Sequence, residues 1–411
     1  MRILNVSSLY PPNIVGGAEM GLKTMSEAMV DLGHQLHVVT LQPPTGTGKP
    51  VGDPSGKVIV HGVPLANIYW PFGSNQRRSV AQKGTWHGID TNNVVMARRV
   101  KNIVASVQPD IVLTRNLQGL STAVIPAVAK MGIPTVHVLH DYGLLCPQTT
   151  LARNGEQCGT QQDRCKSCKI LSLPRWRHAR HLSGVIGVSQ SVLDTHIAHG
   201  LFTHIPRRAI YNALSPRFTI QDAPAIRSPG PMTFGYLARI EKSKGIETLL
   251  EACAALAKKG HDFRLRVAGR GHPDYVDSLK RRFPLPQVSY EGFVDAPEFL
   301  YAIDTLIFPS QWQEALGNGV FEAFSQGTPV IGSDRGGIPE SIDHNINGRV
   351  FRAGSVTQLG SQMIEFIDQP ARHEALGKAA LDKASQYLAQ NRASEYLDFL
   401  TNVVLNQKKV S

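Results

Sequence analysis

The chain has 411 residues, of which 42% are hydrophobic and 18% charged, a composition that permits sizeable cores and argues against disorder. At about 150 residues per domain, this length predicts two or three domains. Lys and Arg outnumber Asp and Glu by 43 to 32, which gives a formal net charge of +11 and favours anionic partners such as nucleotides, phosphates, nucleic acid or acidic lipid headgroups. No apolar run approaches the roughly 18 residues of a membrane-spanning helix.

The opening segment MRILNVSSLYPP lacks the charged leader, long apolar stretch and cleavage site of a signal peptide. We therefore expect a cytoplasmic protein, a setting in which stable disulfides are rare.

Short apolar segments alternate with helical patterns through the first half of the chain, as in buried parallel sheets. Strands are predicted at 2–8, 35–41, 57–63, 110–115, 134–140, 184–189 and 208–212, and helices at 18–32, 92–107, 120–131 and after 189.

A polar segment with three prolines, residues 219–231, predicts an interdomain linker, after which the alternation restarts. Strands are predicted at 232–238, 263–269, 288–294, 304–310 and 328–334, and helices at 244–259, 296–302, 317–326, 355–366, 370–386 and 391–407.

This pattern predicts an α/β fold with two doubly wound, Rossmann-like parallel sheets. The expected division is an N-terminal domain over 1–218, the linker, a C-terminal domain over 232–390, and a final helix over 391–411 that packs back on the N-terminal domain. Ligands bind such sheets beyond the carboxyl ends of the strands, so the loops there are the places to look for chemistry.

The densest signal is QEALGNGVFEAF (313–324), directly after a predicted strand. Glu314 lies in the loop and Glu322 about one turn inside the next helix, with Gly317 near the helix start. Small residues there let an anion approach free backbone N–H groups, while carboxylates accept hydrogen bonds from sugar hydroxyls. The alternative is two surface glutamates on a solvated helix.

A second signal is GYLARIEKSKG (235–245), in which Arg239 and Lys244 follow a predicted strand. An Arg fork with a Lys charge commonly holds a pyrophosphate. The alternative is a solvated basic turn.

A third signal is Gly16 and Gly17 in PPNIVGGAEMG (11–21), between the first strand and helix. Such a loop tolerates a phosphate or sugar, although it is not the G-x-G-x-x-G of a dinucleotide site. The alternative is an ordinary tight turn.

The C-terminal half resembles retaining glycosyltransferases of family 4, which have the GT-B fold of two domains facing a cleft. The likeness runs in order through GYLARIEKSKGIETLLEA, RVAGRG, YEGFV, DTLIFPSQWQEALGNGVFEAFSQGTPVIGSDRGGIPESI and INGRVF, with looser agreement at GGAE, HDY, VIGVSQS and IYN in the N-terminal half. In QEALGN, Ala315 and Leu316 stand where the family commonly has Gly-Phe. They keep the order of a small and then an apolar residue, so we expect the loop to keep the conformation that it has in the family.

The resemblance implies transfer of a sugar from a nucleotide-diphosphate-sugar to a glycan or lipid-linked acceptor, in polysaccharide or glycolipid biosynthesis. It implies no catalytic metal, because cations and helix N-termini neutralise the departing diphosphate. For the donor sugar, the resemblance implies that Glu314 binds its hydroxyls, that His140 lies near the reacting sugar, and that Leu316 and Gly317 bind the donor through backbone N–H groups. For the nucleotide, it implies that Arg239 and Lys244 bind the diphosphate, Glu322 the ribose, Gly269 and Gly271 the nucleoside, and Phe293 and Val294 the base. Gly16 and Gly17 would form the loop beside the phosphate and the acceptor. A structural histidine is the alternative at His140, and a GT-B nucleotide-sugar epimerase is the alternative enzyme.

Four of the five cysteines gather at Cys146, Cys158, Cys165 and Cys168. A Cys-x2-Cys pair with two further thiols nearby predicts structural zinc or an iron–sulfur ligand set. Reduced free thiols and disulfides are the alternatives. Cys253, on the apolar side of a predicted helix, is expected in the core.

Residues 164–182 hold six Lys or Arg and no acid, and residues 70–105 are also basic. Trp176 among Arg175, Arg177 and Arg180 predicts a peripheral contact with an anionic membrane on its inner face. A solvated basic face is the alternative. A metal-containing nucleic-acid-binding protein is the non-enzyme alternative, but no recognition motif accompanies the basic residues, so nucleic acid is not expected as a partner.

Overall fold

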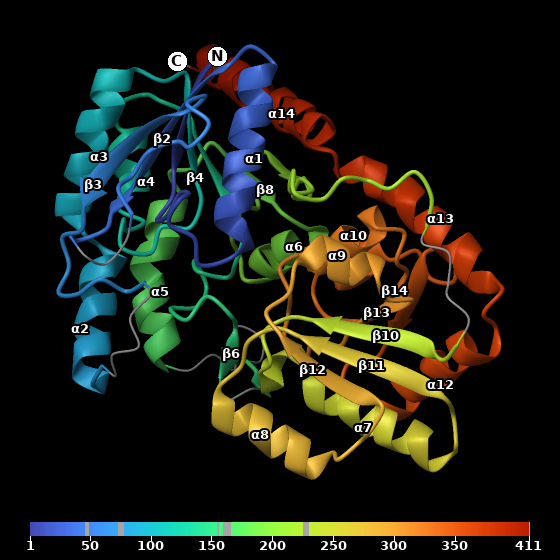
Figure 1. Cartoon of the computed structure of the whole chain (residues 1–411). Coiled ribbons are helices and arrows are strands. Elements are labelled where there is room, and N and C mark those ends of the chain that lie inside the picture. Colours follow the sequence, from blue (N-terminus) through green and yellow to red (C-terminus); the bar gives the residue numbers. More distant parts are fainter. Residues whose placement is uncertain (46–48, 73–77, 154–155, 159–165, 225–229, 411) are drawn as a thin grey trace. The chain divides into compact units, whose positions relative to one another are not determined.

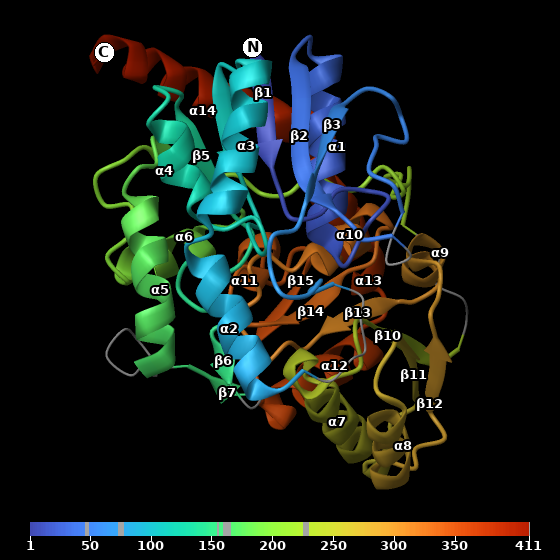
Figure 2. The same cartoon turned by 90° about the vertical axis from the view of Figure 1, so that its left-hand side faces the viewer.

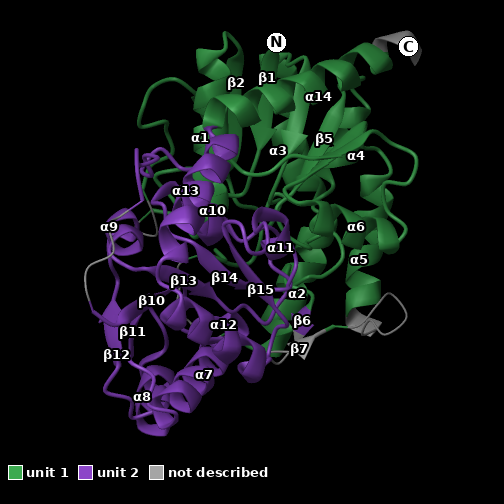
Figure 3. Ribbon diagram, turned by 90° about the vertical axis from the view of Figure 1, so that its right-hand side faces the viewer, with its two compact units in different colours: residues 1–151, 158–213, 389–411 green, residues 152–157, 214–388 purple. Residues whose placement is uncertain are grey.

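The computed structural model describes residues 1–45, 49–72, 78–153, 156–158, 166–224 and 230–410. Its contacts divide the chain into two compact units (Figure 3). Unit 1 comprises residues 1–151, 158–213 and 389–411, and unit 2 comprises residues 152–157 and 214–388.

Unit 1 is built on a seven-stranded parallel sheet of order β3-β2-β1-β4-β5-β8-β9, with helices on its faces (Figure 1). Its strands are β1 (Arg2–Val6), β2 (Gln35–Gln42), β3 (Ile59–Pro64), β4 (Ile111–Thr114), β5 (Thr135–Leu139), β8 (Gly184–Gly187) and β9 (Arg207–Ala209). Its helices are α1 (Gly17–Asp31), α2 (Val80–Thr91), α3 (Val94–Val107), α4 (Val124–Ala129), α5 (Lys166–Ala179), α6 (Gln190–Ala198) and α14 (Ala389–Val410).

The central strands of unit 1 are apolar on both faces because helices cover both, as parallel sheets require. Every residue of β4, β5 and β8 is buried. The last helix, α14, belongs to this unit and packs against α1 (Figure 1). A Cβ atom on Gly184 would lie only 3.1 Å from Val403 and 3.3 Å from Phe399 of α14, so glycine eases the close approach of this helix to β8.

Unit 2 contains a six-stranded parallel sheet of order β12-β11-β10-β13-β14-β15 and a small antiparallel pair, β6-β7. Its strands are β6 (Ala152–Arg153), β7 (Glu156–Gln157), β10 (Met232–Leu237), β11 (Phe263–Ala268), β12 (Val288–Gly292), β13 (Thr305–Phe308), β14 (Val330–Ser333) and β15 (Gly348–Phe351). Its helices are η1 (Lys242–Lys244), α7 (Ile246–Lys258), α8 (Pro273–Arg282), α9 (Ala296–Tyr301), α10 (Asn318–Ser325), α11 (Ile338–Ser341), α12 (Val356–Asp368), α13 (Arg372–Ala384) and η2 (Ser385–Tyr387).

The core of unit 2 joins α7 and α12 to β10 and β11, with Phe234, Leu249, Leu265 and Met363 fully buried in one cluster. Cys253 of α7 lies in this cluster, which confirms the expectation that it is a core residue. Burial raises the pKa of its thiol because the charged thiolate is poorly solvated there.

The two parallel sheets confirm the predicted fold class. Among the described residues, none of the helices combines the length and the hydrophobicity needed to cross a bilayer. The sequence patterns did not predict α2, α5, α8, α11 or β15. Helices α2 and α5 lie side by side in unit 1 (Figure 2), and their inward side chains form part of a pocket described below.

Candidate active site

The predicted donor-site residues of unit 2 cluster at one edge of its sheet. They follow the carboxyl ends of four adjacent parallel strands, β12, β11, β10 and β13, and therefore share that edge. Gly269 and Gly271 follow β11, Phe293 and Val294 follow β12, Arg239 and Lys244 follow β10, and Glu314, Leu316 and Gly317 follow β13.

Lys244 and Glu314 form an ion pair in which Nζ lies 2.5 Å from Oε1. Both side chains are largely buried, 14% and 10% exposed. The Ser310 hydroxyl and the Trp312 indole N–H donate to the same oxygen at 2.8 and 2.6 Å. All three hydrogen bonds end on Oε1, and no described residue donates to Oε2. One oxygen of Glu314 is thus held by three side chains, and the other has no hydrogen-bond donor among the described residues.

Trp312 also supports Lys244, whose Nζ lies 4.7 Å from the centre of the indole ring. A cation over an indole face is stabilised by the negative potential of the ring. Trp312 thus contacts both members of the ion pair. It is a functional candidate that the sequence motifs did not single out.

Backbone packing fixes the loop that carries Glu314. The N–H of Gly337 donates to the Glu314 carbonyl at 2.9 Å, and the N–H of Gly336 donates to Oε1 of Gln313 at 2.6 Å. A Cβ atom on Gly336 would lie 1.9 Å from the Glu314 carbonyl oxygen, so only glycine fits there.

Helix α10 begins at Asn318, immediately after this loop, with Gly317 as its N-cap in the left-handed region (φ 85°). The N-terminus of a helix carries partial positive charge and favours anions. Glu322 lies on the same helix. Burial raises the pKa of Glu322 to about 7, and the nearby charge of Arg217 partly opposes that rise.

Arg239 lies beside a surface hollow of unit 2 that is also lined by Arg270, Gly271 and Tyr275. Its guanidinium pairs with Glu241 at 3.1 Å. The buried Tyr236 hydroxyl donates to the Arg239 carbonyl at 2.8 Å. The pKa of Tyr236 is raised well above its usual value, mainly by burial and further by Glu241, Tyr275 and Glu314. Tyr236 thus contacts the backbone of Arg239 and lies close enough to Glu314 for its charge to act on the hydroxyl.

Close backbone contacts explain the two glycines that follow β11. Gly269 has φ 135°, and a Cβ atom there would lie 1.8 Å from the Ala238 carbonyl oxygen. Gly271 pairs with Ile240 through an isolated bridge, so β10 and β11 remain close beyond their ends. Phe293 is 74% exposed, and the Arg270 guanidinium stacks on its ring with 4.9 Å between the guanidinium carbon and the ring centre.

His140 in unit 1 directly follows β5, and its Nε2 lies 2.8 Å from Nη1 of Arg115. Arginine donates only, so Nε2 accepts and the proton of the neutral ring sits on Nδ1. Burial, followed by the charge of Arg115 and by His137, holds the pKa of His140 well below its usual value. Arg115 itself is buried; it donates to Asn5 at 3.3 Å and contacts the Tyr396 ring on α14.

Gly16 and Gly17 are exposed at the start of α1. The N–H of Gly16 donates to the Glu19 carboxylate at 2.8 Å, and Glu19 is buried. The motif GGAE thus includes one half of a capping box: the Glu19 side chain caps the start of its own helix, while the glycine at the N-cap has no side chain to return the bond. Sequence reasoning singled out the glycines but not this role of Glu19.

Cys146 is buried, and Cys158 and Cys168 are half-buried. Cys165 lies outside the described residues. Within the described part of the chain, no group of three or more His, Cys, Asp or Glu could hold a metal ion. The four-cysteine metal site therefore stays a prediction. Its thiol donors suit tetrahedral zinc.

The predicted exposed basic face is wrong for Arg175 and only partly right for Trp176. Arg175 is buried and donates to the Gly143 carbonyl at 2.5 Å, while the half-buried Trp176 donates to the Leu144 carbonyl at 3.0 Å. These contacts turn both side chains toward the loop after β5. Arg177 and Arg180 remain exposed.

Comparisons with known proteins agree with this architecture. The model for Glycosyltransferase Family 4 matches residues 15–218, and the model for glycosyl transferases group 1 matches residues 219–383. An uncharacterized 42.6 kDa protein in the cps region of Klebsiella pneumoniae is 28% identical over 345 residues, 83% of this chain and 87% of that protein. Glycogen synthase of Mycobacterium tuberculosis is 25% identical over 425 residues, 97% of this chain and 94% of the synthase.

Solved structures match the fold along almost the whole chain. Sucrose-phosphate synthase from Thermosynechococcus elongatus has a TM-score of 0.76 at 16% identity, covering 99% of this chain and 100% of that one. HepE from Anabaena has a TM-score of 0.70 at 18% identity, covering 98% and 100%. Because the two family models together span residues 15–383 and the fold matches GT-B enzymes, the chain belongs to the family 4-like glycosyltransferases.

Proposed function

We propose that this chain transfers a sugar from a nucleoside-diphosphate sugar to a glycan or lipid-linked acceptor, with retention of the anomeric configuration. The observation that carries the proposal is the Lys244–Glu314 ion pair at the carboxyl edge of the unit 2 sheet. It places a cation suited to a diphosphate directly beside a carboxylate suited to sugar hydroxyls.

Lys244 neutralises the departing diphosphate. Its ammonium group has three N–H donors, and Glu314 takes one of them. The other donors and the positive charge serve the phosphate oxygens, where negative charge grows as the sugar leaves. Arg239, largely exposed beside the neighbouring hollow, adds a second cation to the same diphosphate.

Glu314 orients the donor sugar. Its Oε1 is fixed by Lys244, Ser310 and Trp312, so Oε2 has a defined position from which to accept a hydroxyl hydrogen. The N-terminus of α10 and the backbone around Gly317 add positive potential toward the phosphates. Glu322 accepts from the ribose, and the surface around Gly271 and Phe293 holds the nucleoside.

His140 donates from Nδ1 to the reacting sugar, since Arg115 already occupies Nε2. Gly16 and Gly17 form the loop beside the phosphate and acceptor. With Lys244, Arg239 and the α10 N-terminus supplying the charge, the proposal requires no catalytic metal. A structural zinc on Cys146, Cys158, Cys165 and Cys168 would fasten the loop that follows β5.

Named relatives narrow the donor and the product. HepE was solved in complex with UDP and with UDP-glucose, which makes a UDP-sugar the first donor to test. Glycogen synthase is one of the relatives, and so is the amylovoran biosynthesis glycosyltransferase AmsK of Erwinia amylovora. We therefore assign the product to a polysaccharide or glycolipid. We place its synthesis in the cytoplasm, with the exposed Arg177 and Arg180 resting on an anionic membrane.

The test is a transfer assay on the full chain with UDP-, GDP- and ADP-sugars and a panel of glycan acceptors. Nucleoside diphosphate release and the anomeric proton signal of the product are followed together. We expect one donor to be consumed and the anomeric configuration kept. Glu314→Gln and Lys244→Ala should each lose at least about 100-fold in turnover, on the scale of one lost preorganised contact. The control Lys258→Ala, at an exposed position of α7, should match wild type.

Two outcomes would overturn the proposal. Isomerisation of the donor sugar without release of nucleoside diphosphate would indicate an epimerase. Salt-sensitive binding to duplex DNA together with no affinity for any nucleotide sugar would indicate a nucleic-acid-binding protein.

A further inference from the structure

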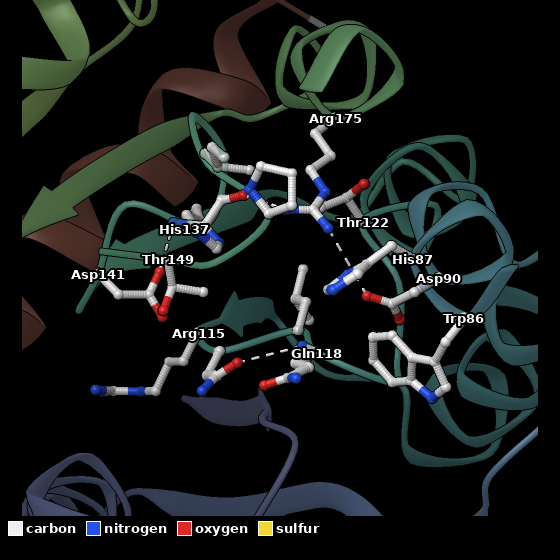
Figure 4. A pocket seen from close by; sticks show the side chains of 15 residues that line it. Trp86, His87, Asp90, Arg115, Gln118, Thr122, His137, Asp141, Thr149 and Arg175 are labelled. Atoms are coloured by element: carbon white, nitrogen blue, oxygen red, sulfur yellow. Dashed lines mark hydrogen bonds and ion pairs between the residues drawn. The ribbon is translucent and has the colours of Figure 1, made fainter. Parts of the chain in front are cut away.

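A second polar pocket lies entirely within unit 1, where none of the predicted site residues line it (Figure 4). Its walls come from the inward face of α2, the loop after β4, His137 of β5, the loop after β5, and Arg175 of α5. Figure 4 shows His87 and Asp90 of α2 on one side, Arg175 above them, and Gln118 below.

The charges of this pocket are already compensated. Arg175 donates from Nη1 to the Gly143 carbonyl, and its Nη2 lies 3.9 Å from Oδ2 of Asp90. Arg115 is occupied by Asn5 and His140, as described above. Asp141 accepts from the N–H of Gly143 at 2.7 Å. Both aspartates lie near Arg175, and the formal charges of the two arginines and two aspartates that line the pocket sum to zero when both carboxyls are ionised.

The pocket nevertheless retains hydrogen-bonding capacity. The gap of 3.9 Å between Arg175 and Asp90 exceeds the roughly 3.2 Å limit of a direct hydrogen bond, and a hydroxyl group placed between them would accept from one and donate to the other. Oδ1 of Asp90 is held by the Gly119 N–H at 2.8 Å, which fixes the carboxylate. Nδ1 of His87 is buried and has no hydrogen-bond partner among the described residues.

The protonation states suit neutral hydroxyl groups. Burial raises the pKa of Asp90 to about 6, so its carboxyl is still mostly ionised at pH 7 and accepts hydrogen bonds. Burial, followed by the charges of Arg175 and Lys83, lowers the pKa of His87, so its ring is neutral and both donates and accepts.

The pocket is small. It spans about 500 Å³ including its open mouth, within the range of about 300–1,000 Å³ that is usual for small-molecule sites. A single sugar residue, with two or three hydroxyls along one edge of its ring, fits this space.

We propose that this pocket binds the hydroxyl edge of a neutral sugar residue of the acceptor, with Asp90, Arg175 and His87 as the residues that select it. The proposal rests on the proposed glycosyl transfer and names its acceptor class: a neutral hexose terminus, as opposed to a uronic acid or a sugar phosphate. The last two bring a negative charge close to Asp90 and Asp141, into a pocket whose formal charges already sum to zero.

The first test measures binding to the full wild-type chain by saturation-transfer NMR. The probes are methyl hexopyranosides of the gluco, galacto and manno series, with glucuronate and glucose 6-phosphate as anionic competitors. We expect at least one neutral glycoside to bind and the anionic sugars to bind at least about tenfold more weakly, the cost of one unmatched buried charge contact. Tighter binding of an anionic sugar would overturn the proposal, as would the absence of binding by every neutral glycoside.

The second test uses variants. Asp90→Asn and His87→Phe should each weaken neutral-glycoside binding about tenfold or more, the effect of one lost hydrogen bond to a polar hydroxyl. The matched control Asp194→Asn, at an exposed position of α6, should bind as wild type does. His87→Phe keeps a ring in place, so it tests the pocket even if Asp90→Asn destabilises the Gly119 loop. Unchanged glycoside binding in a folded variant would contradict the assignment.

UDP binding, measured in the same samples, separates this inference from the proposed function. If the pocket assignment fails, the Asp90 and His87 variants and wild type bind UDP alike and bind the glycosides alike. If the transferase proposal fails, wild type binds no nucleotide whatever the glycosides do.

Discussion

At Trp312 one side chain serves two partners, the Glu314 carboxylate and the Lys244 ammonium. Trp312→Phe keeps an aromatic face beneath Lys244 and removes the N–H donor to Glu314. Hydrogen bonds to charged groups are worth about 1.5–3 kcal/mol, so we expect kcat to fall about 10- to 100-fold with a smaller change in donor KM. Trp312→Leu, which also removes the ring, should lose more.

Steady-state kinetics and thermal unfolding of both Trp312 variants check this expectation. Tyr301→Phe, which changes an exposed aromatic of unit 2, is the control and should behave as wild type. Equal kcat values for wild type and Trp312→Leu would show that Trp312 does not position the ion pair.

Glu322 predicts a pH dependence of nucleotide binding. Burial raises its pKa to about 7, so the carboxylate that accepts from ribose hydroxyls is lost as pH falls below 7. The dissociation constant of UDP should therefore be flat above about pH 8 and rise toward tenfold per pH unit below 7. Titration calorimetry from pH 5.5 to 8.5 measures it.

Glu322→Gln serves as the control for the titration of UDP itself. Ionisation of the terminal phosphate of UDP changes binding to wild type and to the variant equally. The difference between their two pH curves therefore reports the ionisation of Glu322 alone. Parallel curves for wild type and variant would remove Glu322 from the ribose site.

At the residue scale, the sequence predicted the functional side chains that directly follow a strand. Lys244 and Glu314 were predicted from their positions after two strands, and the structure places them in contact. Trp312 and Ser310 could not be predicted in the same way. Their contribution depends on whether one indole N–H and one hydroxyl point at Glu314, which the sequence does not reveal. The Arg115 contact of His140 depends on the register of β4 against β5, which the sequence does not state.

At the scale of elements, the junction between β10 and α7 depends on Gly245. This residue has φ 76°, and a Cβ atom would lie 1.8 Å from the Pro309 carbonyl oxygen. Gly260, at the far end of α7, has φ 78° with no neighbouring atom within 4 Å. The two glycines share the backbone conformation but differ in the space around them.

This pair separates conformational strain from a steric clash. Gly260→Ala should cost about 1–2 kcal/mol of unfolding free energy, the left-handed penalty alone. Gly245→Ala should cost clearly more and should also reduce activity, because relief of the clash moves the segment that carries Lys244. Urea unfolding of both variants gives the comparison, and equal losses would show that the close contact at Pro309 is not maintained.

Helix α5 predicts a lipid-dependent property. Ile170 and Leu173 are 70% and 48% exposed, and they share a helical face with the exposed Lys169 and Arg177. Two exposed apolar side chains beside two cations on this face suit an anionic membrane surface. Co-sedimentation with vesicles should be stronger for phosphatidylglycerol than for phosphatidylcholine and should weaken in Ile170→Ser/Leu173→Ser. Equal sedimentation with both lipids, or an unchanged double variant, would contradict the membrane proposal.

Most elements of the sheets were predictable because buried parallel strands are continuous apolar runs. The missed helices lack the corresponding signal. Helix α2 contains Gly84 and Gly88, α5 contains Pro174 in its interior, and α8 is mainly polar. Helix α2 is instead stabilised by capping, because the Ser79 side chain accepts from the Gln82 N–H, and by packing against α5.

At the scale of the whole molecule, two kinds of site differ in how far they can be predicted. The predicted donor-site residues of unit 2 directly follow consecutive strands, so local sequence motifs can identify them. The unit 1 pocket draws Asp90, Gln118, Asp141 and Arg175 from four separate elements, and no local pattern joins them. Arg175 shows the consequence: its basic neighbours suggested an exposed face, whereas packing of α5 turns it inward.

The transferase proposal depends on Lys244 as the anchor of a nucleotide diphosphate, and the most direct test is the affinity of the full chain for UDP, GDP and ADP by titration calorimetry. One nucleotide should bind wild type and Lys258→Ala with the same dissociation constant, and Lys244→Ala should bind it at least about tenfold more weakly, the loss of one charge-assisted contact. Equal affinity in Lys244→Ala, or no binding of any of the three nucleotides by wild type, would contradict it.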